Sequence, residues 1–405
     1  MAGQDIRTRR LLVAAAVAGF VLRLAFGAVY WVGKPLTHDE REYLALAQSL
    51  ASGRGFVYGE AHETGTAQQF GRAPGYPVFL ALLGPGQNAH ERAPAAVKIV
   101  QSAVGALTVW LIGVWALTIA GPRAAIAAAA IAAVYPPLVV MPAYVLSETL
   151  FAALALAAAL VLQRGEGEAG IAPPIASGVL SGAAALVRPA MLLFLPLAVL
   201  WLVLRRRPAH AVALALAAAA VVAPWTLRNY RTYGRVVVIA SEGGVTFWTG
   251  NHPLARGEGD LAANPDLKRA ELEFRRGHPG LTAEALEPLY YRAALSWIAA
   301  HPLDWIGLMG RKAFYTIVPA GPSYALHSAR YRLASIAPYL VVLPFGLAGA
   351  VRSWRSGRRP VPLFLLAGSA VLMCLVFFPQ ERFRIPVIDP VLIVFAASLA
   401  AGRRS

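Results

Sequence analysis

Residues 11–31 read LLVAAAVAGFVLRLAFGAVYW, an apolar run that carries one arginine. A run of about 20 apolar residues can cross a membrane as an α-helix, because the hydrocarbon layer is about 30 Å thick. Similar runs cover residues 96–119, 142–162, 209–225 and 385–402. The chain is also 58% hydrophobic and only 14% charged, whereas soluble domains are about 45–50% apolar. The sequence therefore predicts an all-α polytopic membrane protein.

The basic residues indicate how the predicted spans are oriented. The net charge is +16, and arginines cluster beside apolar runs, at residues 7–10, 205–207, 352–359 and 403–404. Arginine and lysine are enriched in the cytoplasmic connections of polytopic proteins. We therefore assign these clusters to the cytoplasmic side and exclude a nucleic-acid surface. The single cysteine, Cys374, excludes a disulfide framework and a CxxC metal site.

Two long polar stretches, residues 32–95 and 226–302, follow predicted outward spans. Both should therefore lie on the external side of a single membrane domain that covers residues 1–405. They hold six and eight of the 21 acidic residues, so any acid chemistry is expected there. Residues 303–319 carry a central Arg-Lys pair and should lie along the membrane interface. The bundle then has about ten spans, or eleven if residues 303–319 also cross.

The first external stretch supplies a candidate base. It begins with Thr37-His-Asp-Glu-Arg-Glu-Tyr43, after which apolar residues recur at helical spacing. Asp39 shares a face with Tyr43, so the helix would place its carboxylate beside an apolar site, and the helix dipole would keep it charged. We expect Asp39 to be a catalytic base. Glu40 is a second acidic candidate, although Thr37 and Glu40 also match a capping box that would close the first turn.

Charged residues near predicted spans are candidates for phosphate binding. Arg72 precedes the rigid segment Ala-Pro-Gly-Tyr-Pro77, where a guanidinium could bind a lipid phosphate bidentately. A snorkelling interfacial anchor explains Arg72 equally well. Arg188 and Glu148 lie in or at the end of apolar runs, where a charge is costly and a functional role is the default hypothesis.

Two arginines near the C-terminal end form another candidate pair. Arg382 and Arg384 flank Phe383, and in an extended segment residues two apart project to one side. Such a pair would suit a phosphate. Interfacial anchoring is the competing interpretation, but external arginines run against the usual charge bias.

The second external stretch is expected to carry short amphipathic helices and one small hairpin. Its arginine-rich start, which contains Arg228, predicts a short helix. The β-prone residues that follow and the glycine pair at 243–244 predict the hairpin. Asn251 and His252 could then line a sugar site, although turn chemistry explains them at least as well.

Taken in order, these stretches resemble the bacterial branch of the GT-C glycosyltransferases. This group contains protein O-mannosyltransferases, aminoarabinose–lipid A transferases and related lipopolysaccharide-core transferases, and is similar to glycosyltransferase family 39. The resemblance covers most of the chain and is carried by Asp39-Glu40 with Tyr43, Arg72-Ala-Pro-Gly-Tyr-Pro77, Leu186-Val-Arg-Pro189, Pro224-Trp-Thr-Leu-Arg-Asn-Tyr230, Gly243-Gly244 to Gly250-Asn251, and Arg382-Phe-Arg-Ile-Pro386. It implies a multi-pass GT-C bundle in the bacterial inner membrane, with its active site facing the periplasm.

The resemblance also implies a mechanism. Asp39 would take the proton from an acceptor hydroxyl of a lipid, glycan or protein, and polyprenyl phosphate would leave from the opposite face of the sugar. The leaving phosphate would be bound by Arg72, Arg188, Arg228, Arg382 and Arg384, and substrates would contact Tyr43, Tyr76, Asn251 and His252. The lipid A transferases have a metal-associated acidic residue where this chain has Gly71, which leaves a divalent cation open as a cofactor.

Two other functions would use the same features. A transporter or flippase of lipid-linked sugars also needs a polytopic bundle with internal arginines. The sequence shows no repeated pair of broken segments in matched halves, and its long external stretches favour an enzyme. The third alternative is a non-catalytic protein that binds a lipid phosphate. The sugar and the acceptor depend on pocket shape, so the motifs define neither.

Overall fold

The computed structural model describes residues 2–31, 33–57, 71–84, 93–167, 170–259, 261–357 and 359–400, and within them the chain is built from helices without a strand. Four of the described helices are long and apolar enough to cross a membrane. The first is Ile6–Tyr30, which combines most of α1 (Ala2–Ala25) with the π-helical turn after it. The other three are α4 (Ala95–Ala120), α10 (Pro208–Tyr233) and α15 (Ala329–Arg355). The predicted all-α polytopic membrane fold is confirmed.

The remaining apolar segments are shorter or broken. α5 (Pro122–Val134) and the segment Pro136–Ala143, which begins with α6 (Pro136–Val140), meet at a bend of 59° and form a broken span or a re-entrant segment. The shorter helices are α7 (Glu148–Arg164), α8 (Ala172–Val187), α9 (Phe194–Leu204), α16 (Val361–Val376) and α18 (Ile388–Ser398). Because length alone does not make these helices spans, the expected total of about ten stays a prediction.

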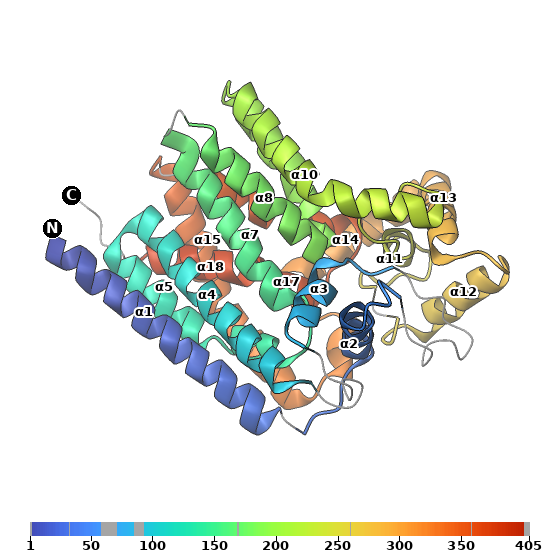
Figure 1. Cartoon of the computed structure of the whole chain (residues 1–405), viewed down its shortest axis with the longest axis horizontal. Helices are drawn as coiled ribbons and strands as arrows, with labels where there is room; N and C mark the ends of the chain where they lie inside the picture. Colours follow the sequence, from blue (N-terminus) through green and yellow to red (C-terminus); the bar gives the residue numbers. More distant parts are fainter. Residues whose placement is uncertain are drawn as a thin grey trace.

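Small residues bring the helices of the bundle close together. α8 packs on α10, where a Cβ at Gly178 would lie 2.4 Å from the Leu214 carbonyl oxygen and one at Gly182 would lie 2.9 Å from that of Ala218. Small residues four apart allow this backbone approach in membrane helices. α15 also packs on α18, and α1 lies along α4 and α5 (Figure 1).

A buried arginine stabilises the break after α5. Arg23 of α1 is 1% exposed, and its guanidinium donates to the carbonyl oxygens of Gly19, Ala132 and Ala133 at 2.9 to 3.1 Å. The carbonyls at the end of α5 have no partner in the next helical turn, because the chain bends there. Arg23 therefore has a structural role.

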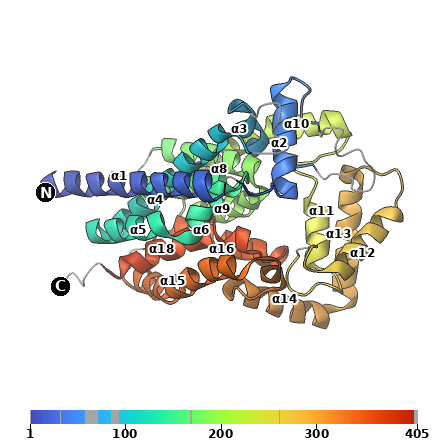
Figure 2. The same ribbon diagram turned by 90° about the horizontal axis from the view of Figure 1, so that it is seen from below.

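The polar segments gather at one end of the bundle. α2 (His38–Ala51) and α11 (Gly243–Gly250) lie there with α12 (Pro265–Arg276) and α13 (Ala283–Ala300), at the end away from the start of α1 and the end of α18 (Figures 1 and 2). α3 (Gly75–Leu82), α14 (Pro302–Ile317) and the short α17 (Glu381–Arg384) complete the described architecture. The side of the membrane that this end faces stays a prediction.

The expected hairpin does not form. Residues 236–240 are irregular, and the glycine pair begins helix α11 instead of a turn between strands. Side chains of α10 bind the backbone carbonyls that a partner strand would have bound: Asn229 donates to Val237 and Ile239, and Trp225 also donates to Ile239. The hairpin prediction was wrong because these tertiary bonds replace a strand ladder.

Candidate active site

One cavity of about 730 Å³ lies at the end of the bundle that carries α2 and α11, and both helices line it. Segments from the whole length of the chain line it, including α2, the start of α7, the loop after α10, α13 and α17. Its wall carries both signs of charge. The acidic lining residues are Asp39, Glu148, Glu242, Glu284 and Glu287, and the basic ones are Arg72, Arg188, Arg235 and Arg382.

The first turn of α2 places Asp39 in this cavity. Thr37 caps the helix: its hydroxyl accepts from the Glu40 backbone N–H at 3.3 Å, and Glu40 Oε2 accepts from the Thr37 N–H at 2.7 Å. The second oxygen of Glu40 accepts from the Val145 N–H at 2.9 Å. Glu40 is buried in these contacts and is not among the cavity-lining residues. The structure therefore gives Glu40 a structural position, while Asp39 faces the cavity.

Two arginines from distant parts of the chain hold Asp39. Arg72 Nη2 lies 2.8 Å from Oδ1, and Arg382 Nη1 lies 2.5 Å from Oδ2. Burial by itself raises the pKa of Asp39, but the charges of Arg382 and Arg72 outweigh it, so the pKa lies well below its usual value. Asp39 is therefore an anion and, while both arginines hold it, a weak base.

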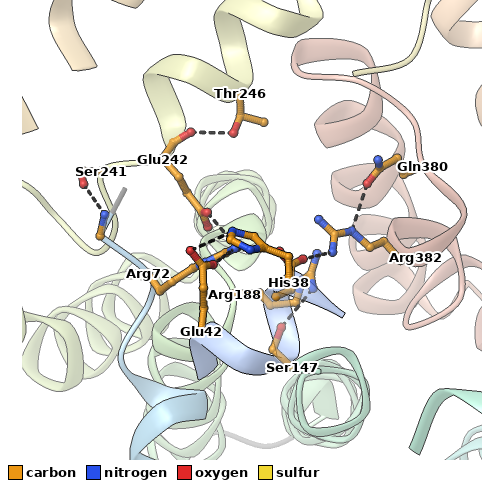
Figure 3. Close-up of polar contacts among 12 residues, drawn as sticks. His38, Glu42, Arg72, Ser147, Arg188, Ser241, Glu242, Thr246, Gln380 and Arg382 are labelled. Atoms are coloured by element: carbon orange, nitrogen blue, oxygen red, sulfur yellow. Dashed lines mark hydrogen bonds and ion pairs between the residues drawn. The ribbon is translucent and has the colours of Figure 1, made fainter. Parts of the chain in front are cut away.

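Arg72 is the centre of this network. Its Nε donates to Glu42 Oε2 at 2.9 Å, and its Nη1 donates to Glu242 Oε2 at 3.2 Å (Figure 3). The backbone beside it is fixed as well, because Gly71 and Ser241 exchange two hydrogen bonds. The network thus joins the first polar stretch of the sequence to the second.

A second ion pair lies beside Arg382. Arg188 follows α8 in an extended conformation, which the next residue, a proline, favours. Its Nη1 lies 2.6 Å from Glu148 Oε1 and donates to Ser147 Oγ at 3.1 Å. The guanidinium also lies 5.3 Å from the ring centroid of Phe383. Figure 3 shows Arg188 and Arg382 meeting at the same part of the cavity.

Two of the predicted phosphate ligands lie elsewhere. Arg384 is buried, pairs with Asp389 at 3.0 Å and stacks 3.9 Å from the centroid of the Tyr339 ring. The segment is a helical turn rather than an extended strand, so residues two apart point about 200° apart. Arg228 stacks on Trp225 at 4.9 Å and donates to the Tyr233 hydroxyl at 3.0 Å. Neither arginine lines the cavity.

Of the two predicted substrate-binding tyrosines, only Tyr43 lines the cavity. Its ring supports Arg72 at 5.4 Å and packs edge-on against Tyr76 at 4.9 Å. Tyr76 is fully buried, and its hydroxyl donates to Gln101 at 2.7 Å. Tyr76 thus supports the wall of the cavity from behind.

Asn251 and His252 also lie outside the lining residues. Asn251 donates to the carbonyls of Phe247 and Val376, and its oxygen accepts from Trp305 and Lys312, all at 2.9 to 3.1 Å. It therefore ties α11 to α14 and α16. His252 packs on a tryptophan, and burial lowers its pKa to about 4. Both residues therefore have structural positions outside the cavity, and their role as sugar contacts stays a prediction.

Sequence reasoning did not single out the acidic wall that α13 adds. Glu284 accepts from the Ser241 hydroxyl at 3.3 Å, and Glu287 packs on Gly243, where an added Cβ would lie 3.1 Å from its Oε1. The pKa of Glu287 is raised to about 7: burial is the main cause, a hydrogen bond from Gly244 opposes it, and the charges of Glu284 and Glu242 add to it. The spacing of Glu284 and Glu287, three apart on one helix, was a usable signal. Within the described residues, no three His, Cys, Asp or Glu side chains are grouped to hold a metal ion.

No protein-family model and no curated protein matches this chain. Solved structures do. The archaeal oligosaccharyltransferase AglB of Archaeoglobus fulgidus, in complex with an inhibitory peptide and a dolichol-phosphate, is 15% identical with a TM-score of 0.53, and the alignment covers 97% of this chain and 50% of that one. An oligosaccharyltransferase of the same archaeon, tethered to an acceptor peptide, is 15% identical with a TM-score of 0.56. That alignment covers 97% of this chain and 49% of the other.

A third structure is ArnT of Cupriavidus metallidurans bound to undecaprenyl phosphate. It is 14% identical, with a TM-score of 0.42, and the alignment covers 96% of this chain and 77% of that one. The present chain spans about half the length of the oligosaccharyltransferases. At this identity the likeness concerns the fold, and it shows that the chain has the GT-C fold.

Proposed function

We propose that this chain with the GT-C fold is a membrane glycosyltransferase that moves a sugar from a polyprenyl-phosphate donor to an acceptor hydroxyl. The observation that carries the proposal is the convergence of Asp39, Arg72 and Arg382 in one cavity. A carboxylate next to two guanidinium groups provides a base and a phosphate site within one active site.

The surroundings of the cavity fit a lipid-linked donor. An apolar groove of about 830 Å³ runs between α9 and α10, and it shares Leu192, Val236 and Val238 with the charged cavity. A polyprenyl chain in this groove would place its phosphate at the cavity entrance. The AglB structure with dolichol-phosphate supports this class of donor for the fold.

Donor binding would also activate the base. The phosphate would compete with Asp39 for Arg72 and Arg382, and the side chain of Arg382 is 43% exposed and so accessible to it. As the guanidinium groups move to the phosphate, the cause of the lowered Asp39 pKa is removed. Asp39 then becomes a stronger base only when a donor is present.

Transfer would proceed as a single displacement. Asp39 takes the proton of the acceptor hydroxyl, and the oxygen forms a bond to the anomeric carbon. The bond from that carbon to the phosphate oxygen breaks, and polyprenyl phosphate leaves with the electron pair. Arg72 and Arg382 stabilise the negative charge that grows on the leaving group, an effect typically worth several kcal/mol. The configuration at the anomeric carbon is inverted.

We also propose that this site lies at the external face of a bacterial inner membrane, and the arginine clusters assigned to the cytoplasmic side support the external position. The test is mass spectrometry of envelope glycans and polyprenyl-phosphate sugars from cells that lack the protein. Accumulated donor together with a truncated glycan, both restored by the wild-type gene and not by Asp39→Asn, would support the proposal. Unchanged donor and glycan pools would contradict it.

A further inference from the structure

Glu148 is a buried carboxylate in the cavity wall with unused hydrogen-bonding capacity. It is the first residue of α7 and is 2% exposed. Arg188 Nη1 lies 2.6 Å from Oε1 and also donates to Ser147 Oγ at 3.1 Å, whereas within the described part of the chain Oε2 accepts no hydrogen bond. A buried carboxylate oxygen that accepts no hydrogen bond is destabilising, even where the charge of the group is paired. Such a group calls for a partner.

The other cavity acids differ from Glu148 in this respect. Asp39 accepts from two arginines, Glu242 from Arg72, and Glu284 from Ser241. Glu287 accepts from a backbone N–H of α11. Glu148 is thus a lining carboxylate with one oxygen, Oε2, for which the described residues supply no hydrogen-bond donor.

The place of Glu148 in the cavity indicates what this donor is. Arg188, which pairs with Glu148, and Arg382 both lie against the ring of Phe383, at 5.3 and 5.6 Å from its centroid, so Glu148 lies close to the proposed phosphate site. A phosphate would be repelled by the carboxylate. The group that follows the phosphate in a donor is the sugar, whose hydroxyls are hydrogen-bond donors and carry no charge.

We infer that Glu148 binds hydroxyl groups of the transferred sugar, and that Arg188 positions Glu148 instead of binding the phosphate. This inference rests on the proposed function. Two oxygens of one carboxylate can accept from two neighbouring hydroxyls of a pyranose or furanose ring. Because Arg188 neutralises Glu148, the pair suits an uncharged sugar rather than one that carries an acid or an amine.

The test compares the affinity of two kinds of ligand for the purified full-length protein in lipid nanodiscs. One is bare polyprenyl phosphate, and the other is polyprenyl phosphate that carries mannose, glucose or arabinose. For Glu148→Gln we expect the affinity for the sugar-bearing ligand to fall about 10- to 100-fold. Bare polyprenyl phosphate should bind as before or more tightly, because Arg188 loses its counter-ion.

Glu284→Gln is the matched control, since this glutamate is buried in the same cavity but has a hydroxyl partner. It should keep the wild-type ratio of the two affinities. If Glu148→Gln weakens both ligands equally, or neither, Glu148 serves only to hold Arg188 and the inference fails. It also fails if wild-type protein binds none of the sugars more tightly than bare polyprenyl phosphate.

Deoxy donors test the same point without a protein variant. Removing one hydroxyl at a time from the sugar should identify at least one position where wild-type affinity drops about tenfold and where Glu148→Gln shows no further drop. Equal affinity for every deoxy donor would overturn the inference. Arg382→Ala distinguishes failure of this inference from failure of the proposed function. If the proposed function holds, this variant must weaken the binding of bare polyprenyl phosphate, whatever residues contact the sugar.

Discussion

Replacing Asp39 by asparagine should separate its two roles. The side chain is 23% exposed and accepts two charge-assisted hydrogen bonds, at 2.8 and 2.5 Å. Asparagine keeps the size and one oxygen acceptor, but it loses the charge and the ability to take a proton. Loss of a general base typically slows a reaction about 10²–10⁴-fold.

The same change should strengthen donor binding. In the wild type, a phosphate must displace Asp39 from Arg72 and Arg382. In Asp39→Asn, one of these charge-assisted bonds is absent, and such a bond contributes about 1.5 kcal/mol at the low end of its range. We therefore expect the affinity for bare polyprenyl phosphate to rise about tenfold while transfer is nearly lost.

The assay measures equilibrium binding of polyprenyl phosphate and the single-turnover rate of transfer with the same protein preparation. Glu40→Gln is the control, because Glu40 neighbours Asp39 but caps the helix, and it should lower the free energy of unfolding by about 1 kcal/mol with a smaller loss of rate. Wild-type turnover by Asp39→Asn would refute the base assignment. Weaker phosphate binding by this variant would refute the competition between Asp39 and the donor.

Three further predictions concern the clamp, the acidic wall and the topology. Arg382→Ala should weaken donor binding and slow transfer, and Arg382→Lys should restore both only partly, because lysine lacks the bidentate fork of arginine. Arg384→Ala should instead lower the melting temperature. Equal effects of the two alanine variants on donor binding would contradict this prediction. The folded pKa of Glu287 is about 7 against 4.5 in the unfolded chain, so the stability that it contributes is present below pH 4.5 and lost as the pH rises to 7. Thermal melts should show this loss in the wild type and a flatter profile in Glu287→Gln, and identical profiles would disprove the shift. Single cysteines placed in residues 226–302 and 352–360, in a background without Cys374, should react from opposite sides of the membrane, and labelling from one side would mean that residues 303–319 cross it.

Local signals in the sequence were sufficient to predict the structure of the first turn of α2. The capping box involves residues three apart, and the position of Asp39 depends only on helical periodicity. For this reason the sequence predicted both the cap and the direction of Asp39. The apolar runs were informative in the same way, since span length and hydrophobicity are local properties.

Predictions that depended on the conformation of a short segment were less successful. Arg384 was paired with Arg382 on the assumption of an extended chain, and a single helical turn sends it to Asp389 instead. Asn251 looked like a turn residue open to a ligand, whereas its side chain is bonded to Phe247 of α11 and to residues of α14 and α16. In both cases residues distant in the sequence determine the position of the side chain.

The pairing of Glu148 with Arg188 shows a further limit. Each residue was notable by itself as a charge near a predicted span, yet nothing in the sequence joins two positions 40 residues apart. The packing of α7 against α8 brings them together. The acidic wall on α13 was overlooked because its glutamates resemble the solvent-exposed side of an amphipathic helix.

The most direct test is an experimental structure of the protein with bound polyprenyl phosphate. We expect the lipid chain in the groove between α9 and α10, the phosphate between Arg72 and Arg382, and both arginines beyond hydrogen-bonding distance of Asp39. A phosphate bound elsewhere, with the contacts from Arg72 and Arg382 to Asp39 intact, would contradict the proposed donor site and the activation of Asp39 by the donor.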